Sequence, residues 1–434
     1  MKSSATFGNR FSLTQKQLAW LVWSLGAAFF FAEYFTRIAP GVMVPELTRA
    51  FATNALGIGA ISGGFYFAYV GMQVPVGILV DKFGPRRLLT LNSLLCGIGC
   101  LLFAFSHVLE QAVFARVLMG FGSAFAFVST LKLASVWFPS QQFGLLAGLT
   151  QALGMLGAAV GDAPMAMTVD SLGWRNTMLL IAAIFVLLAI ATYWIVRDQP
   201  TRTTAIAAKE VSQTPSPLKG LLAVISSKQN CLNALYAGLL FAPTTVFGEL
   251  WGVSYLVNVY GLSKSVAASA VGMVFVGWAC GGPIVGWLSD RLGQRRPLML
   301  VSAICGLVIM GTVLWCAVMP VWLLFLLLFL FGVTNTGLGL AYATAVELNP
   351  RALSGTAAAF ANMTSVIIGA VLQPIIGGLL DRQVALAKVK GFSTALAYQH
   401  AFIVLPICFV LAFLLAFYVR ETYCRPVVDE AYCS

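Results

Sequence analysis

Long apolar segments alternate with short polar ones along almost the whole chain. A hydrocarbon core of about 30 Å needs about 20 helical residues to cross it, and on this criterion the sequence predicts twelve spans. The predicted spans are 18–44, 56–80, 88–107, 111–137, 142–168, 174–197, 231–258, 265–288, 297–318, 320–346, 352–380 and 398–419. Helices are expected, because an open sheet leaves backbone groups unsatisfied in lipid and a barrel alternates residue by residue. The pattern therefore predicts an all-α integral membrane protein.

The composition excludes a soluble enzyme. Of the 434 residues, 59% are hydrophobic and only 9% are charged, whereas soluble domains carry about 25% charge. The net charge of +11 does not indicate nucleic-acid binding, because the basic residues fall in short groups between apolar runs. Such groups are typical of orientation signals in membrane proteins.

One long polar segment divides the chain. Residues 198–228 read as a linker between two six-helix halves, 18–197 and 229–419, with an N-terminal segment 1–17 and a tail 420–434. Lys and Arg are concentrated in the segments on the same side as the N-terminus. This asymmetry predicts that both termini and the linker are cytoplasmic.

Several kinds of chemistry find no support in the sequence. The nine cysteines show neither zinc spacing nor a redox C-x-x-C motif and are expected to be reduced structural thiols. The two histidines are too few for a histidine metal cluster, and the chain has no P-loop and no G-x-S-x-G motif. We therefore expect no metal, no cofactor and no enzymatic activity. Short loops and unpaired thiols favour a bacterial inner membrane.

An eleven-residue motif occurs twice, at residues 77–87 (GILVDKFGPRR) and 286–296 (GWLSDRLGQRR). Each copy lies at the end of the second predicted span of its half. The shared residues are Gly77, Asp81, Gly84, Arg86 and Arg87 in the first copy and Gly286, Asp290, Gly293, Arg295 and Arg296 in the second. The second glycine of each copy permits a tight turn, and the aspartate can meet an arginine or a helix N-terminus. We interpret both copies as gating loops, although the arginines could serve only as positive-inside anchors.

The repeated pattern G-x-x-x-D-[RK]-x-G-x-[RK]-[RK] resembles the loop signature of the major facilitator superfamily, over about residues 15–420. The segment that starts at Arg116 (RVLMGFG) is similar to the R-x-x-x-G-x-G motif of that family. The resemblance implies two pseudo-symmetric six-helix halves, a monomer, and secondary transport by alternating access with the substrate bound between the halves. The fifth span lacks the G-P-x-x-G-G ending of drug antiporters, which argues against multidrug export.

The first span carries a weaker resemblance. Tyr34-F-T-Arg37 is similar to the first helix of the organophosphate and anion:cation symporter branches, where this arginine holds an anionic substrate. The organophosphate carriers use a second arginine in their seventh span, but residues 231–258 contain no Lys or Arg. A single carboxylate is therefore the better expectation than a phosphate ester.

Four charged residues of the first half are predicted to lie at similar depth inside the membrane: Glu33, Arg37, Arg116 and Asp162. Glu33 and Arg37 are four residues apart, so they share a helix face and can pair. The resemblance implies that Glu33 and Arg116 form a proton-coupling pair, and Asp162 is the further acid of this cluster. The alternative is a structural cluster that does not titrate.

The candidate substrate-binding residues are Tyr34, Arg37, Glu249, Trp251, Tyr255 and Asn335. A guanidinium at residue 37 can hold a carboxylate with two hydrogen bonds, or it can neutralise a nearby acid or extend to the lipid headgroups. Glu249 has no basic partner in its own span and could contact a substrate amino group or cap an extracellular gate. The aromatic and amide side chains could equally serve helix packing.

These observations predict a proton-linked importer of a small carboxylate-bearing nutrient, such as an amino acid, a short peptide or an organic acid. Its partners are the substrate, protons and the lipid bilayer. An exporter or uniporter of the same solutes remains open, as does a non-transporting membrane sensor with the same fold. A sensor would be expected to carry an additional cytoplasmic domain, for which the linker and tail leave little room.

Overall fold

The computed structural model describes residues 14–199, 217–316 and 319–425, and every regular element within these ranges is a helix. Twelve helical segments within these ranges are long and apolar enough to cross a membrane. Both the all-helical class and the number of spans agree with the prediction from the sequence. The protein is therefore a multi-pass integral membrane protein.

The first half is built from six long helices and one short one. They are α1 (Gln15–Val42), α2 (Val44–Ala50), α3 (Ala55–Phe83), α4 (Pro85–Ala104), α5 (Leu109–Trp137), α6 (Ser140–Leu172) and α7 (Trp174–Ile195).

The second half contains more interruptions. Its elements are α8 (Pro217–Ser226), α9 (Lys228–Pro243), the π-helix η1 (Thr244–Trp251), α10 (Gly252–Tyr260), α11 (Lys264–Leu292), α12 (Arg296–Trp315), α13 (Val321–Asn335), α14 (Gly337–Glu347), α15 (Arg351–Lys390), α16 (Thr394–Phe402) and α17 (Val404–Tyr418).

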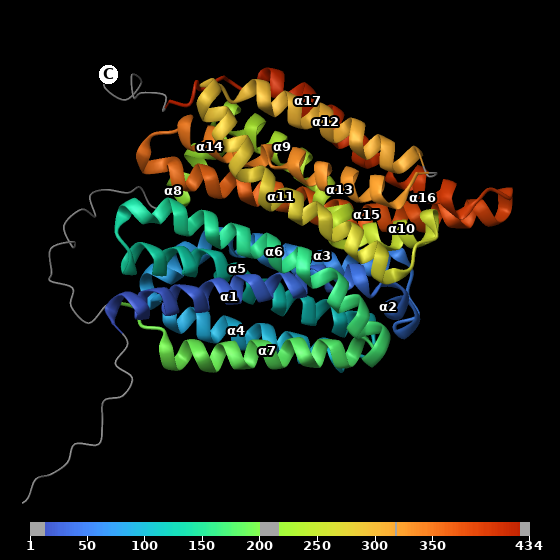
Figure 1. Cartoon of the computed structure of the whole chain (residues 1–434), viewed down its shortest axis with the longest axis horizontal. Helices are drawn as coiled ribbons and strands as arrows, with labels where there is room; N and C mark the ends of the chain where they lie inside the picture. The colour runs from blue at the N-terminus through green and yellow to red at the C-terminus, as the bar shows by residue number, and fades with distance from the viewer. Residues whose placement is uncertain (1–13, 200–216, 317–318, 426–434) are drawn as a thin grey trace, which may run out of the picture.

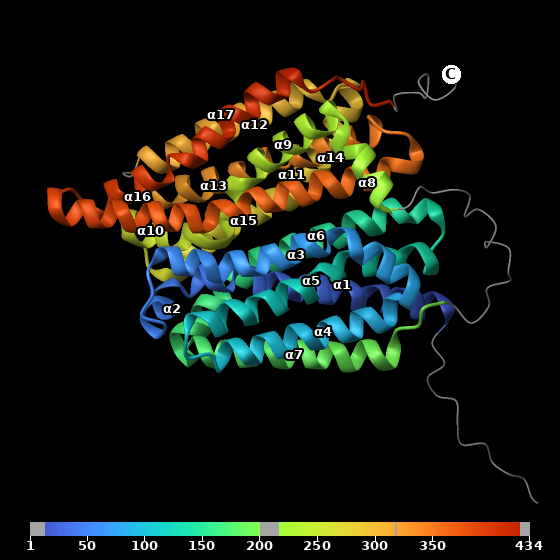
Figure 2. The ribbon, with the colours of Figure 1, turned by 180° about the vertical axis from the view of Figure 1, so that it is seen from behind.

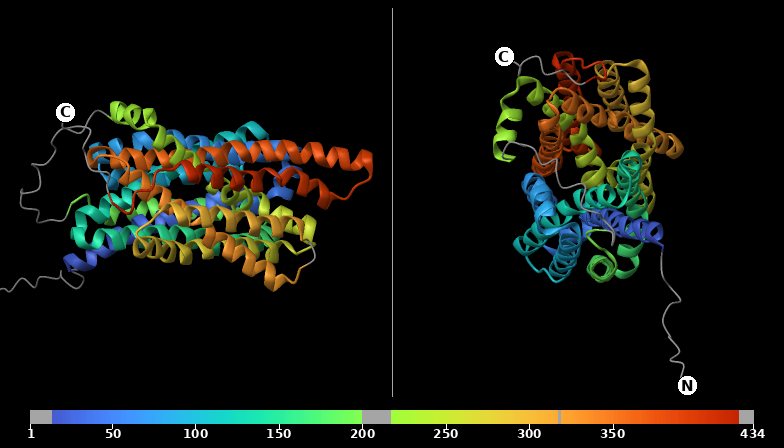
Figure 3. Two further views of the ribbon diagram at one scale, coloured as in Figure 1. Left: turned by 90° about the horizontal axis from the view of Figure 1, so that it is seen from above. Right: turned by 90° about the vertical axis from the view of Figure 1, so that its left-hand side faces the viewer.

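The two halves lie side by side as separate bundles. Figures 1 and 2 show α1–α7 on one side of the molecule and α9–α17 on the other, and the right-hand view of Figure 3 shows both bundles nearly end-on. The main contacts between the halves are α3 with α15 and α6 with α11. We call the end of the molecule where α1 begins and α17 ends the terminal end, and the opposite end the far end.

Four spans depart from simple helices, and one of them, the twelfth, is divided at Ile403 between α16 and α17. The seventh span changes from α9 to the π-helix η1 directly after Pro243, and the tenth is divided at Thr336 between α13 and α14. The eleventh span, α15, is 40 residues long. Figure 2 shows that its end and α16 project beyond the rest of the bundle at the far end.

Candidate functional site

A cavity of about 760 Å³ lies between the two halves. At its deep end it is lined by Tyr34 and Arg37 of α1, and it reaches the terminal end at Asp290 and Arg295. The cavity therefore opens toward the terminal end in this conformation.

The halves meet at the far end instead. Lys264 of α11 contacts Glu46 of α2 at 2.9 Å and Asp170 of α6 at 3.1 Å. The carboxylate of Asp381 on α15 accepts hydrogen bonds from the first two backbone amides of α3, those of Ala55 and Leu56, both at 2.9 Å. These polar contacts close the far end of the cavity.

Arg37 combines a charge partner with aromatic neighbours. Its Nη2 atom donates to Glu33 Oε1 at 2.9 Å, one helical turn earlier on α1. Its guanidinium carbon lies 4.5 Å from the ring centre of Tyr34 and 4.9 Å from that of Tyr69. Its Nε atom is buried and has no hydrogen-bond partner in the described part of the chain. The predicted pair of Glu33 with Arg37 is thus present, and Arg37 retains donor capacity beside the cavity.

Arg116 and Asp162 do not join this pair. Arg116 donates to the carbonyl oxygens of Thr36 and Ile61, so it holds the backbone of α1 next to Arg37. Among the described residues it makes no ion pair with Glu33 in this conformation. Asp162 is 1% exposed, and its Oδ2 atom has no hydrogen-bond partner within the described ranges. All four charged residues that the sequence predicts inside the membrane are buried, but within the described ranges only Glu33 and Arg37 share an ion pair.

Glu249 finds a partner in the other half of the molecule. The phenol of Tyr66 on α3 donates a hydrogen bond to Glu249 Oε2 on η1. The ring of Tyr66 is 5.9 Å from the Arg37 guanidinium carbon, so this contact lies next to the candidate substrate-binding arginine.

The other three candidate binding residues do not line the cavity in this conformation. Trp251 donates from Nε1 to the carbonyl of Gln373, and Tyr255 donates to the carbonyl of Leu314. The amide of Asn335 donates to Phe331 at the break between α13 and α14. These contacts are helix-to-helix or within one helix, which is the packing alternative raised from the sequence.

The cavity contains a polar chain that the sequence did not single out as a binding site. Asn362 of α15 donates to Gln73 of α3 at 3.0 Å and accepts from Tyr342 of α14 at 2.9 Å. All three residues line the cavity. Gln73 shares a face of α3 with Tyr69, but the sequence could not indicate which residue of the second half it meets.

The first loop motif forms a capped turn. Gly84 has φ of 81°, a region that favours glycine, and it connects α3 to α4. The backbone amide of Arg86 donates to Asp198 beyond the end of α7, and its side chain donates to the carbonyl of Tyr193. Arg87 is exposed, Gly77 lies within α3, and the side chain of Asp81 lies outside what the structure describes.

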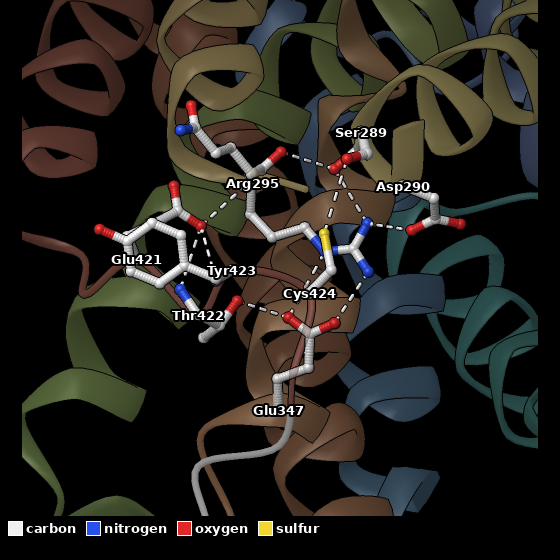
Figure 4. A network of polar contacts seen from close by, with 9 residues as sticks. Ser289, Asp290, Arg295, Glu347, Glu421, Thr422, Tyr423 and Cys424 are labelled. Carbon is white, nitrogen blue, oxygen red and sulfur yellow. Dashed lines mark hydrogen bonds and ion pairs between the residues drawn. The ribbon is translucent and has the colours of Figure 1, made fainter. Parts of the chain in front are cut away.

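The second loop motif has the more extensive network (Figure 4). Arg295 contacts Glu347 at the end of α14 and Asp290 at the end of α11, both at 2.8 Å. Gly293 has φ of 64° in the turn, and Gly286 lines the cavity.

The second motif is also capped by the segment after α17. The Glu421 carboxylate accepts hydrogen bonds from the backbone amides of Arg295 and Arg296 at 2.9 and 2.8 Å. Burial alone would raise the pKa of Glu421, but these backbone hydrogen bonds outweigh it and lower the pKa. In the first motif, Asp198 accepts one such bond, from the backbone amide of Arg86, so each loop has a carboxylate cap from a segment that follows the last span of its half.

A family model supplies the classification. The model of the Major Facilitator Superfamily matches residues 25–374. The chain belongs to the major facilitator superfamily. This family of membrane transporters accounts for the two-bundle architecture, the repeated loops and the cavity between the halves, and it is not a family of enzymes.

Relatives in this superfamily align with low identity. The probable galactarate/D-glucarate transporter GudP of Escherichia coli (strain K12) is 24% identical, and the alignment covers 86% of this chain and 88% of GudP. The membrane sensor protein UhpC of the same strain is 26% identical, with 70% and 72% covered. The probable sulfoacetate transporter SauU of Cupriavidus necator is 24% identical, but the alignment covers only 42% of this chain and 43% of SauU.

Solved structures share the fold. An inward-facing bacterial homolog of the human lysosomal transporter Spinster superimposes with a TM-score of 0.75 at 13% identity, covering 93% of this chain and 97% of the other. A mutant form of the nucleoside transporter NupG gives 0.72 at 14% identity, covering 93% and 98%.

Proposed function

We propose that this protein imports a small carboxylate-bearing nutrient together with protons by alternating access. The observation that carries the proposal is the position of Arg37 at the closed end of the cavity, with Tyr34 and Tyr69 beside its guanidinium. A guanidinium keeps its charge in any surroundings and can hold a carboxylate through two parallel hydrogen bonds.

The substrate class agrees with the charges of the cavity. Within the described residues, the charged side chains that line it are Arg37, Asp290 and Arg295, and the last two are paired with each other at its mouth. Arg37, the cation at the deep end, can pair with one acid group of a substrate. Two relatives are named as probable transporters of sulfoacetate and of galactarate or D-glucarate, which are organic acids, and these names support an acidic substrate for this chain.

Proton coupling follows from competition for Arg37. The ionised Glu33 carboxylate occupies one nitrogen of the guanidinium, so a substrate anion that enters the cavity must share Arg37 with it. Protonation of Glu33 removes this competing charge and leaves Arg37 to the substrate. Binding one anion would then favour binding one proton, while Arg116 holds the adjacent turn of α1. Asp162 is a further site where a proton could reside, since its Oδ2 atom is buried without a partner in the described part.

The distribution of Lys and Arg supports an orientation with both termini in the cytoplasm, and the short loops and unpaired thiols support a bacterial inner membrane. In that orientation the cavity opens inward, and the contacts of Lys264 and Asp381 form the closed outer gate. Import then requires these contacts to break while the loop motifs at the terminal end close together. We propose that the protein acts as a monomer.

Uptake of a labelled carboxylate into proteoliposomes tests the proposal. Purified protein should accumulate the substrate when the lumen is alkaline, and Glu33→Gln should exchange substrate across the membrane but lose the dependence on the pH gradient. Arg382→Gln, at an exposed arginine of α15, is the control that should behave as wild type. Uptake that does not depend on protons and is unchanged in Glu33→Gln would refute the coupling. Without any flux, the alternative of a sensor, the role named for UhpC, would be favoured.

A further inference from the structure

The middle of the cavity is lined by aromatic rings from both halves, and the proposed function does not use them. Phe30 of α1 and Phe127 of α5 contribute from the first half, with ring centres 5.1 Å apart. Phe241 of α9 and Trp278 of α11 contribute from the second half, with ring centres 6.0 Å apart. An aromatic wall thus stands on each side of the path between the halves.

The rings lie at a defined distance from Arg37. Phe30 precedes Arg37 by seven residues on the same helix, which corresponds to two turns and a rise of about 10 Å. Tyr34 lies between Phe30 and Arg37, and its ring centre is 5.4 Å from that of Phe30. A small molecule that holds its acid group on Arg37 would therefore extend its body along Tyr34 toward the aromatic walls.

Trp278 adds a polar feature to its wall. The residue is 9% exposed, and its Nε1 atom is buried without a hydrogen-bond partner in the described ranges. It occupies the middle of α11, Lys264–Leu292, and so lies about halfway through the bundle. Buried indole N–H groups usually have a partner, so a donor left unpaired beside a cavity indicates that a ligand oxygen can supply it.

We infer that the substrate is a monocarboxylate with a flat, largely apolar ring, an aromatic monocarboxylate above all, whose ring lies between Phe30–Phe127 and Phe241–Trp278. This inference rests on the proposed function, because it assigns the acid group to Arg37. Arg37 is the one cation that lines the deep cavity among the described residues, and this disfavours a second acid group. Polyhydroxylated acids are also disfavoured, because aromatic faces offer their many hydroxyl groups few hydrogen-bond partners. An oxygen on the ring is the acceptor for Trp278 Nε1.

Calorimetric titration of the purified full chain with benzoate, 4-hydroxybenzoate and gluconate tests the inference. We expect both aromatic acids to bind at least about tenfold more tightly than gluconate, because they alone bury a ring against the walls. Trp278→Phe keeps an aromatic ring and removes only the N–H group. It should weaken 4-hydroxybenzoate by about fivefold, the usual size of one neutral hydrogen bond, and leave benzoate unchanged. Trp278→Ala should weaken both aromatic acids and spare gluconate.

Trp287→Phe is the matched control, because Trp287 lies on the same helix and is 58% exposed on the outer surface. It should bind all three acids as the wild type does. If Trp278→Ala does not fold, Phe127→Ala provides the same comparison from the opposite wall.

The outcomes separate the two proposals. If gluconate binds at least as tightly as the aromatic acids and loses affinity in the double variant Glu33→Gln/Arg37→Gln, the inference is wrong and the proposed function stands. The inference is also wrong, and the proposed function again stands, if the substitutions at Trp278 and Phe127 leave the affinity ratio unchanged. If no carboxylate binds at all, both are wrong.

Discussion

The phenol of Tyr66 on α3 donates a hydrogen bond to the carboxylate of Glu249 on η1, and this bond joins the two halves beside Arg37. Both side chains are buried, with 1% and 2% of their surface exposed. The sequence left two roles open for Glu249, a contact with a substrate amino group or a part of the outer gate. The contact with Tyr66 favours the gate, because it must break when the far ends of the halves separate.

Removing this bond should loosen the far end. In Tyr66→Phe the backbone amide hydrogens of η1 and of the part of α3 around residue 66 should exchange faster, because the buried bond that joins these two elements is gone. Hydrogen–deuterium exchange with mass spectrometry reports this directly. Tyr418→Phe, at a tyrosine that is 70% exposed, should leave the exchange unchanged. Equal exchange in wild type and Tyr66→Phe would exclude a gating role for the pair.

A methyl group at Gly59 should prevent the far end from closing. A Cβ atom there would lie 2.8 Å from the backbone nitrogen of Pro374 and 2.9 Å from the carbonyl oxygen of Gln373, both on α15 in the other half. Backbone atoms cannot move aside as a flexible side chain can, so Gly59→Ala should reduce the transport rate by about tenfold or more while the protein still folds.

Gly71→Ala is the matched control for Gly59→Ala, since it lies on the same helix and its Cβ atom would meet nothing within 4 Å. Initial uptake rates in proteoliposomes, normalised to the reconstituted protein, measure the effect. A Gly59→Ala variant that transports as fast as Gly71→Ala would show that the tight far-end contact is not part of the cycle.

The cap at Glu421 makes stability depend on pH. Because hydrogen bonds from Arg295 and Arg296 lower the pKa of Glu421 below its usual 4.5, its ionised form stabilises the folded state above that pH, and this contribution disappears as the pH falls through the lowered pKa. Glu421→Gln should therefore lower the Tm at neutral pH. The loss should be at most about 1 kcal/mol, because solvent screens this partly exposed group. Thermal melts from neutral to acidic pH measure the difference, and a difference that stays constant with pH would contradict the account.

The fold was largely predictable because the hydrophobic pattern of the spans is a direct consequence of the bilayer. The positions at which the spans end were less predictable from the sequence. The apolar pattern predicts that the eleventh span ends at residue 380, but α15 continues to Lys390. The apolar pattern marks where the membrane-crossing segment ends, whereas charged residues such as Asp381 can continue the helix beyond it. The interruption by η1 was not predictable either, since a π-helix has the same composition as an α-helix. Helix α8 lies in the segment that the sequence assigned to a polar linker.

The site was predictable only in part. Spacing of four residues on one helix was enough to pair Glu33 with Arg37. Contacts between distant segments could not be predicted, because no pattern along the chain indicates that Tyr66 contacts Glu249 or that Gln73 contacts Asn362. Trp278 was not recognisable for the same reason: its position in the middle of an apolar span looks like packing until the cavity beside it is seen.

The central claim is that Arg37 binds the carboxylate of the substrate. The affinity of the purified protein for its best-binding carboxylate tests it most directly, measured by calorimetry in wild type, Arg37→Lys and the double variant Glu33→Gln/Arg37→Gln. The double variant avoids leaving Glu33 as a buried charge without a partner. We expect Arg37→Lys to weaken binding, because an ammonium lacks the two-pronged geometry, and the double variant to weaken it by about 30-fold, the size of a hydrogen bond to a charged group. Arg382→Gln should retain the affinity of the wild type. Equal affinity in wild type and the double variant would contradict the account, because the carboxylate would then be held elsewhere.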